Sequence, residues 1–104
     1  MPKGYWIARI DVTDTEIYQG YRVAAKEALK KYGGRFLVRG GEVLASEGSQ
    51  RSRLIVVEFP TIEQAKQCFD SPEYAVAKAI RLKSATCDFA VATGYDGEQP
   101  DGST

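Results

Sequence analysis

The chain has 104 residues, of which 43% are hydrophobic and 27% charged, and its 14 basic residues balance 14 acidic ones. This length suits one domain with one hydrophobic core, and a formal charge of zero provides no basic field that would attract nucleic acid. The sequence contains no histidine, which excludes Ser-His-Asp catalysis, His-ligated zinc and His-ligated haem.

Residues 4–12 (GYWIARIDV) combine aromatic and β-branched residues in a short run, which predicts a first strand. Thr13 and Glu16 form a capping box, so we expect a helix to begin there and to end at Gly33. Its apolar residues recur at spacings of three and four, which predicts that one side is buried. They are Ile17, Tyr21, Ala24, Ala25, Ala28, Leu29 and Tyr32.

Residues 35–39 (RFLVR), between glycine pairs, and 53–59 (RLIVVEF), ending at a proline, predict two further strands joined by a turn-rich connection over 42–52. Thr61 begins a second helix, which is expected to break where Ser71 caps a new helix that starts at Pro72. A last strand is predicted over 86–93.

The order strand, helix, strand, strand, helix, strand predicts an α+β ferredoxin-like βαββαβ domain over residues 1–94, with a four-stranded antiparallel sheet and the helices on one face. Residues 95–104 contain almost no apolar side chains and are expected to form a disordered acidic tail. No apolar run approaches the roughly 20 residues of a membrane helix, so we expect a cytoplasmic protein without a membrane partner. Cys68 and Cys87 lack CxxC spacing, so neither a metal site nor a cofactor is expected.

The strand at 53–59 is apolar on both faces at 54–57, although helices in this arrangement cover only one face. An exposed apolar sheet face is a large hydrophobic patch, which favours packing against a second copy of the chain. The alternative is that the long connection after Gly41 covers it. A homodimer is the expected assembly.

Four segments, in order and at these separations, resemble the domain-of-unknown-function 1330 family: GYWIARIDVTD, KYGGRFLVRGG, VVEFPTIEQA and DSPEY. The resemblance implies a dimeric α+β barrel, in which two four-stranded sheets pack face to face. It implies no reaction, because the family's activity is not established. Related barrels include cofactor-independent monooxygenases, haem-degrading enzymes, lactone isomerases and ligand-binding regulators.

The candidate ligand site combines Arg39 and Gly40 with Glu58 and Tyr74. An arginine at a strand end, followed by glycines that let backbone amides approach closely, suits a carboxylate or an enolate. The alternative is that the glycines satisfy turn geometry and Arg39 pairs with Glu58 on the neighbouring strand.

Tyr32, Tyr74 and Trp6 complete the candidate ligand-binding residues. Their rings suit either the wall of a cavity between helices and sheet or the hydrophobic core. These residues favour binding of a small anionic or carbonyl-bearing organic molecule. A cofactor-independent monooxygenase- or isomerase-like enzyme and a non-catalytic regulatory module remain the alternatives, and the sequence does not decide whether the protein is an enzyme.

Overall fold

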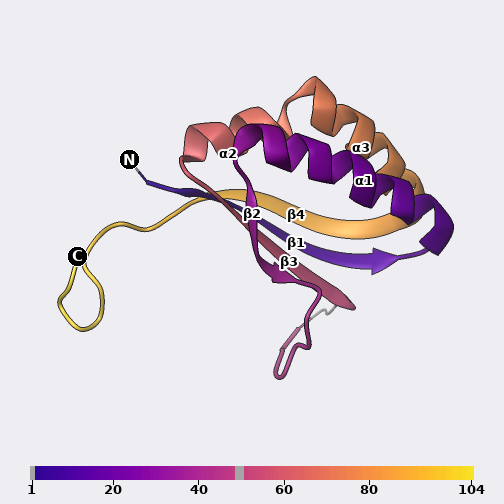
Figure 1. The fold of residues 1–104 in the computed structure, drawn as a ribbon. Helices are drawn as coiled ribbons and strands as arrows, with labels where there is room; N and C mark the ends of the chain where they lie inside the picture. The colour runs from indigo at the N-terminus through magenta and orange to yellow at the C-terminus, as the bar shows by residue number, and fades with distance from the viewer. Residues whose placement is uncertain (1, 49–50) are drawn as a thin grey trace.

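The computed structural model describes residues 2–48 and 51–104. Its elements are β1 (Gly4–Val12), α1 (Thr15–Tyr32), β2 (Arg35–Arg39), β3 (Arg53–Phe59), α2 (Ile62–Phe69), α3 (Pro72–Ser84) and β4 (Ala85–Thr93). The strands form one antiparallel sheet in the order β2-β3-β1-β4, and the three helices lie on one of its faces (Figure 1). The predicted ferredoxin-like α+β fold is confirmed, with the second helix divided into α2 and α3.

Polar side chains fix the starts of the helices. The carboxylate of Asp14 caps α1 by accepting a hydrogen bond from the amide of Ile17 at 3.1 Å. The prediction of Thr13 as the cap is therefore wrong by one residue. Asp14 has the extended backbone and the side-chain acceptor that a cap requires. Thr61 and Ser71 cap α2 and α3 as predicted, each accepting from the amide three residues later.

The core lies between the helices and the sheet, with Trp6 at its centre. Trp6, Ala8 and Ile10 of β1 are 3%, 3% and 2% exposed. The indole N–H of Trp6 donates to the carbonyl of Ala65 at 3.0 Å. Its ring packs against the rings of Phe59, Phe69, Tyr74 and Phe89.

Helix α1 buries a slightly different side from the predicted one. Ile17, expected in the core, is 43% exposed, whereas Tyr18 is only 4% exposed. Neighbouring residues of a helix point about 100° apart, so burying Tyr18 turns Ile17 towards solvent. The other buried side chains of α1 follow Tyr18 at spacings of three and four residues and so lie on the same side of the helix. They are Tyr21, Ala25, Ala28 and Leu29.

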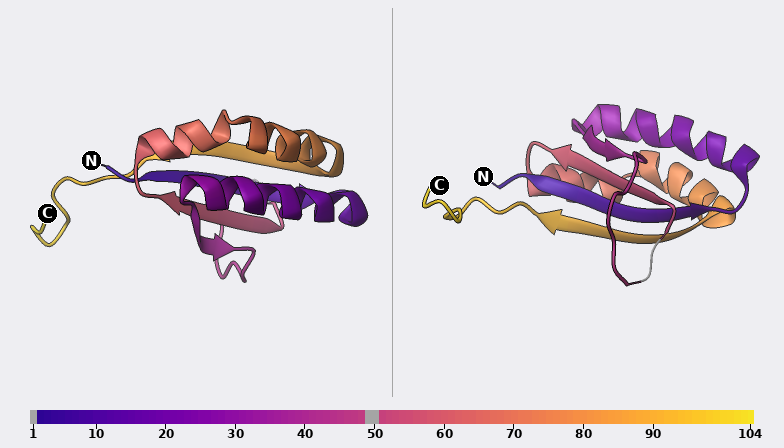
Figure 2. Two further views of the ribbon diagram at one scale, coloured as in Figure 1. Left: turned by 45° about the horizontal axis from the view of Figure 1, so that its top comes forward. Right: turned by 90° about the horizontal axis from the view of Figure 1, so that it is seen from below.

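The opposite face of the sheet carries an apolar row without a helix over it. Strand register aligns Val38, Val56, Ile7 and Ala90 across all four strands. The view from below shows none of the described helices on this side (Figure 2). Ile7 remains 41% exposed and Val38 36% exposed. We call these four residues the open-face row.

The connection between β2 and β3 extends below this face rather than lying flat on it (Figures 1 and 2). Among its described residues, Arg51 pairs with Asp11 at 3.1 Å and with Asp88 at 3.0 Å, at one end of the sheet. The described part of the connection therefore holds that end of the sheet and leaves Ile7 and Val38 of the open-face row exposed. The tip of the connection at 49–50 is outside the described residues.

Residues 95–104 form neither helix nor strand, and their predicted disorder stays a prediction. Within the described chain, no helix is both long and apolar enough to cross a membrane. The same residues contain no group of His, Cys, Asp and Glu side chains that is suited to hold a metal ion.

Candidate ligand-binding site

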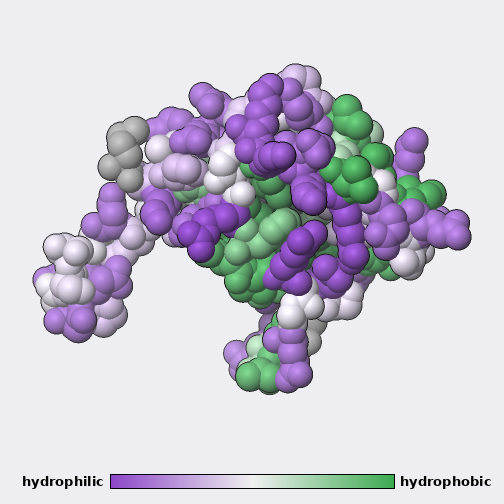
Figure 3. Space-filling view, in the orientation of Figure 1, coloured by the Kyte–Doolittle hydropathy of each residue, from purple (hydrophilic) through white to green (hydrophobic). Residues whose placement is uncertain are grey.

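A cavity opens between α1 and the strands of the sheet, and about 50 Å³ of it is accessible to water. Figure 3 shows hydrophobic surface below α1, flanked by hydrophilic side chains. The apolar lining of the cavity comes from Trp6, Ala8, Ile10, Ala25, Leu29, Phe36, Ile55, Val57 and Phe89. An apolar floor of this kind favours a ligand with a hydrophobic body.

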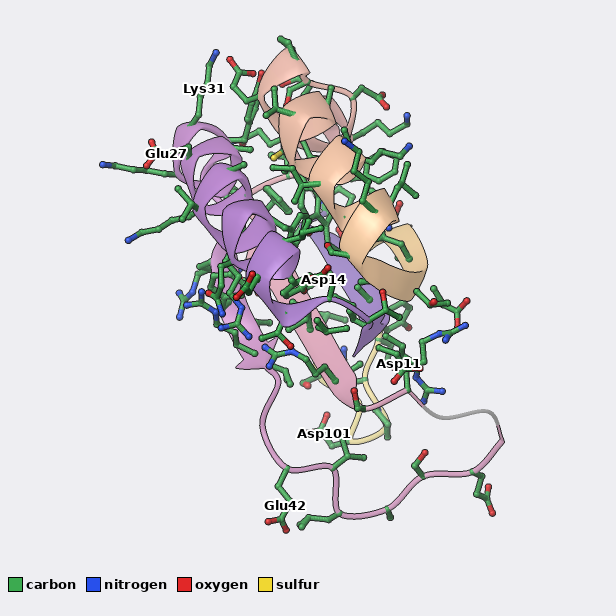
Figure 4. The ribbon with its side chains drawn as sticks, turned by 90° about the vertical axis from the view of Figure 1, so that its right-hand side faces the viewer. Asp11, Asp14, Glu27, Lys31, Glu42 and Asp101 are labelled. Atoms are coloured by element: carbon green, nitrogen blue, oxygen red, sulfur yellow. The ribbon has the colours of Figure 1, made fainter. Side chains whose placement is uncertain are left out.

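Four cationic side chains line the same cavity: Arg22 and Lys26 from α1, Arg39 from β2 and Arg53 from β3. None of the described lining residues is acidic, and Glu27, which follows Lys26, points out into solvent (Figure 4). Among the ion pairs that the described residues form, none includes any of the four cations. In a chain of zero net charge, this cavity is therefore a local concentration of positive charge.

A β-bulge brings Arg39 to the cavity. Phe36 is opposite Val57 on β3, whereas Val38 is opposite the adjacent Val56, so two residues of β2 stand against one of β3. Such an extra residue reverses the alternation of side chains beyond it. Arg39 consequently faces the helices; without the bulge it would face the open side of the sheet.

Gly40 makes room for Arg53. Its φ of +67° lies in the left-handed region, and a Cβ there would lie 2.6 Å from Nη2 of Arg53. The amide of Gly40 is already used, donating to the carbonyl of Leu54 at 2.9 Å. Gly40 thus contributes space for a guanidinium rather than a free amide. The Nε of Arg53 is buried and has no hydrogen-bond partner among the described residues.

Two tyrosines of α1, Tyr18 and Tyr21, also line the cavity. The guanidinium carbon of Arg22 lies 5.6 Å from the centroid of the Tyr18 ring. The hydroxyl of Tyr21 is 2.9 Å from that of Tyr74, which is fully buried behind it. Burial, with a further contribution from Tyr74, raises the pKa of Tyr21 well above its ordinary value. The Tyr21 phenol is therefore neutral near pH 7 and able to donate a hydrogen bond.

Glu58 lies on the other face of the sheet and does not line the cavity. It accepts a hydrogen bond from the hydroxyl of Tyr5 at 3.1 Å and lies 3.4 Å from the ammonium of Lys3. Burial alone would raise the pKa of Glu58, but the interactions with Tyr5 and Lys3 prevail and lower it. The expected pairing with Arg39 is wrong, because Glu58 is opposite Arg35 and the bulge turns Arg39 to the helix side.

The structure brings only some of the predicted ligand-binding residues together at the cavity. Trp6 and Arg39 line the cavity, and Tyr74 is one hydrogen bond away from it. Tyr32 is half-buried outside the lining, and its hydroxyl is 3.5 Å from the carboxylate of Glu73.

Sequence reasoning missed Arg53, Arg22 and Lys26. Arg22 and Lys26 stand four residues apart, which places them on one side of α1, and this spacing was the available signal. Arg53 carried no such signal, since its position depends on its packing against Gly40.

Comparison with solved structures shows the fold. A protein of unknown function from Rhodopseudomonas palustris, RPA0582, aligns with a TM-score of 0.73 at 14% identity, over 92% of this chain and 85% of that one. SnoaB, a cofactor-independent oxygenase from Streptomyces nogalater, aligns with a TM-score of 0.64 at 9% identity, over 93% and 97%. A dimeric protein of unknown function with a ferredoxin-like fold, from Bacteroides fragilis, aligns with a TM-score of 0.51 at 15% identity, over 88% of this chain and 95% of that one.

No curated protein matches the sequence. A family model matches residues 3–95, which is nearly the whole chain and includes every strand and helix of the fold. The family is described as a domain of unknown function, so the match carries no reaction with it. The chain belongs to the DUF1330 family.

Proposed function

We propose that this protein is a homodimer that binds a small organic anion with an apolar body in the cavity below α1. The observation that carries the proposal is the cavity lining, in which Arg22, Lys26, Arg39 and Arg53 surround an apolar floor with no acidic residue among the described lining.

The two parts of this lining suit the two parts of one ligand. A guanidinium binds a carboxylate or an enolate through two parallel hydrogen bonds, and several guanidiniums close together repel one another until an anion neutralises them. A ring or alkyl chain placed on the floor removes apolar surface from water, which is worth roughly 25 cal/mol per Å². The cavity accordingly favours a small carboxylate or a carbonyl compound that forms an enolate.

The open-face row supports the homodimer. Ile7 and Val38 are exposed in the single chain, and packing two copies face to face would remove the whole row from water. The Bacteroides fragilis protein, with a similar fold, is described as dimeric. The helix-covered face, where the cavity lies, stays accessible in such a pairing.

An oxygenase- or isomerase-like reaction is the weaker alternative. It would have to occur in this cavity, and no described carboxylate lines it to take a proton from a substrate. Binding without chemistry needs only the groups that the cavity contains.

Thermal stability in the presence of benzoate and of benzamide tests the binding proposal. Benzoate is expected to raise the melting temperature of the wild type and benzamide, which is uncharged and of similar shape, is not. Arg39→Gln should reduce the benzoate effect, whereas Arg35→Gln, the same change on the other face of β2, should not. Equal effects of the two compounds on the wild type would contradict the proposal.

A further inference from the structure

We infer that the ligand of the cavity carries two separate anionic groups: the two cations of α1 bind one of them, and the two arginines of the sheet bind the other. An apolar body lies between the two groups. The ligand class is then a dicarboxylate built on a ring or a short chain. This inference rests on the proposed binding of an organic anion and specifies the charge of that anion.

The helix wall of the cavity carries one pair of like charges. Arg22 and Lys26 both line the cavity, stand four residues apart on α1 and are exposed. Residues at this spacing are neighbours on the surface of a helix, and like charges there repel each other. No carboxylate in the described lining offsets this repulsion. The pair therefore presents two positive charges to the opening of the cavity.

The sheet wall carries a second pair of like charges. Arg39 is opposite Ile55, and Arg53 precedes Ile55 by two positions on β3, so the two arginines are diagonal neighbours on the helix side of the sheet. Long side chains at diagonal positions reach each other. A Cβ on Gly40, the residue after Arg39, would lie 2.6 Å from Nη2 of Arg53, so this guanidinium lies against the end of β2. Its buried Nε has no hydrogen-bond partner in the described chain.

The position of Tyr18 shows that the two pairs face the same space. Its ring lines the cavity, and the guanidinium carbon of Arg22 lies 5.6 Å from the ring centroid. Burial raises the pKa of Tyr18, and the charges of Arg53 and Arg22 act against this increase. One cation from each wall therefore interacts with the same phenol. A ligand between the walls is accordingly within reach of both pairs.

The surface between the two pairs is apolar. Phe36 and Ile55 belong to the lining, and the guanidinium carbon of Arg39 lies 4.3 Å from the centroid of the Phe36 ring. A carboxylate attached to a ring or chain on this floor is therefore beside a guanidinium. A second carboxylate on the same body, directed away from the sheet, reaches the cations of α1.

A single carboxylate does not balance this arrangement of charges. It can lie between the members of one pair, and the other pair then keeps its repulsion. A second carboxylate on the same ligand removes that repulsion too. Because both groups belong to one molecule, the second interaction costs no further loss of translational freedom. Two pairs of cations thus favour a ligand with two anionic groups.

Two probes of the same shape that differ by one charge test this inference: terephthalate and 4-carbamoylbenzoate. Both are titrated calorimetrically at mildly alkaline pH, where all their carboxyl groups are ionised. The wild type is expected to bind terephthalate about tenfold more tightly, because its second carboxylate adds two exposed ion pairs of modest strength.

Variants on the two walls should affect the probes differently. Arg22→Gln combined with Lys26→Gln should abolish the preference for terephthalate and leave the affinity for 4-carbamoylbenzoate nearly unchanged. The carboxylate of that probe binds at the sheet, where Arg53 is half-buried and less screened by water. Arg39→Gln should weaken both probes by a similar factor.

The matched control is Lys30→Gln combined with Arg35→Gln. This variant also loses two positive charges, but both lie outside the cavity lining. The preference for terephthalate should be the same as in the wild type. If the control loses the preference to the same extent as the variant on α1, net charge explains the result and the inference is wrong.

The dependence on ionic strength provides a second readout. Salt screens exposed ion pairs, so the affinity for terephthalate should fall more steeply with sodium chloride concentration than the affinity for 4-carbamoylbenzoate. With Arg22→Gln and Lys26→Gln combined, the two slopes should be equal. Equal slopes in the wild type would contradict a second ionic contact.

The outcomes separate the two proposals. Equal affinity of the wild type for both probes, or a preference that survives the loss of both cations of α1, would overturn the dicarboxylate and leave the binding of one carboxylate intact. Binding of neither probe would overturn both proposals.

Discussion

The two faces of the sheet use the same strands in opposite ways. On the helix side, Trp6 and Ala8 are each 3% exposed, whereas Ile7, which lies between them, is 41% exposed on the open side. Successive side chains of a strand point to opposite faces of the sheet, so each strand contributes to two surfaces with different surroundings. The first surface packs against the helices of the same chain, and the second is the surface at which we propose that two copies of the chain pack.

The helix side is also not uniform. Around Trp6 it is filled by aromatic rings, but between α1 and the strands β2 and β3 it opens into the cation-lined cavity. Packed rings contribute stability, whereas cations that form no ion pair with the described residues and lie beside an apolar floor cost stability. This difference supports our proposal that the part of the helix side lined by cations binds an anion.

The largest expected effect concerns the aromatic core around Trp6, between the helices and the sheet. Trp6→Ala should lower the free energy of unfolding by about 3–5 kcal/mol, because it removes a buried indole and its hydrogen bond to Ala65. Tyr95→Ala, at a residue that is 70% exposed, should change it by less than about 0.5 kcal/mol. Urea unfolding measures both, and similar values for the two variants would contradict the assignment of the core.

The next effect concerns the open face. Ile7→Glu should weaken dimerisation at least about a hundredfold, because the substitution places a carboxylate from each copy in an apolar interface. Ile17→Glu is the matched control, since that residue is 43% exposed on α1, away from the sheet. Sedimentation equilibrium measures the molecular mass of both variants in solution. If both remain dimers, the interface does not lie on the open face.

A smaller effect is expected at the cavity. Arg39→Gln and Arg53→Gln should each weaken the binding of benzoate by about tenfold, the loss of one charge-assisted interaction. Lys30→Gln, also on α1 but outside the cavity lining, should have no effect. Isothermal titration calorimetry provides the affinities; an unchanged affinity in both arginine variants would remove these residues from the site.

The smallest effect is a pH dependence on the open face. The pKa of Glu58 is lowered in the folded protein, so the unfolded chain binds a proton more readily. The stabilisation from Glu58 is therefore complete above its ordinary pKa of 4.5 and is lost as the pH falls through the lower folded value. Glu58→Gln should accordingly show a smaller drop in melting temperature between pH 7 and pH 3 than the wild type, whereas Glu27→Gln should not.

Much of the fold was predictable because it depends on local patterns. The strands β1 and β3 follow from short β-branched runs, and the break between α2 and α3 follows from Ser71 and Pro72. The errors were small shifts, such as Asp14 in place of Thr13 as the cap of α1. Such shifts arise because adjacent polar residues compete for the same helix start.

The site was less predictable because it depends on contacts between distant segments. Arg39 was identified from its glycines, but the bulge that turns it to the cavity depends on pairing with β3 and leaves no mark in the local sequence. The alternative that Arg39 pairs with Glu58 rested only on their being on neighbouring strands, and the register instead puts Glu58 opposite Arg35. Arg53 reaches the cavity only by packing against Gly40, 13 positions earlier in the sequence.

The fluorescence of Trp6 tests the central claim most directly, because it is the only tryptophan and lies in the floor of the cavity. A nitrobenzoate bound there would quench it. We predict saturable quenching by 3-nitrobenzoate that weakens in Arg39→Gln, and only weak, non-saturating quenching by 3-nitrobenzamide. Identical quenching by the charged and the uncharged compound would contradict the account of the cavity as an anion site.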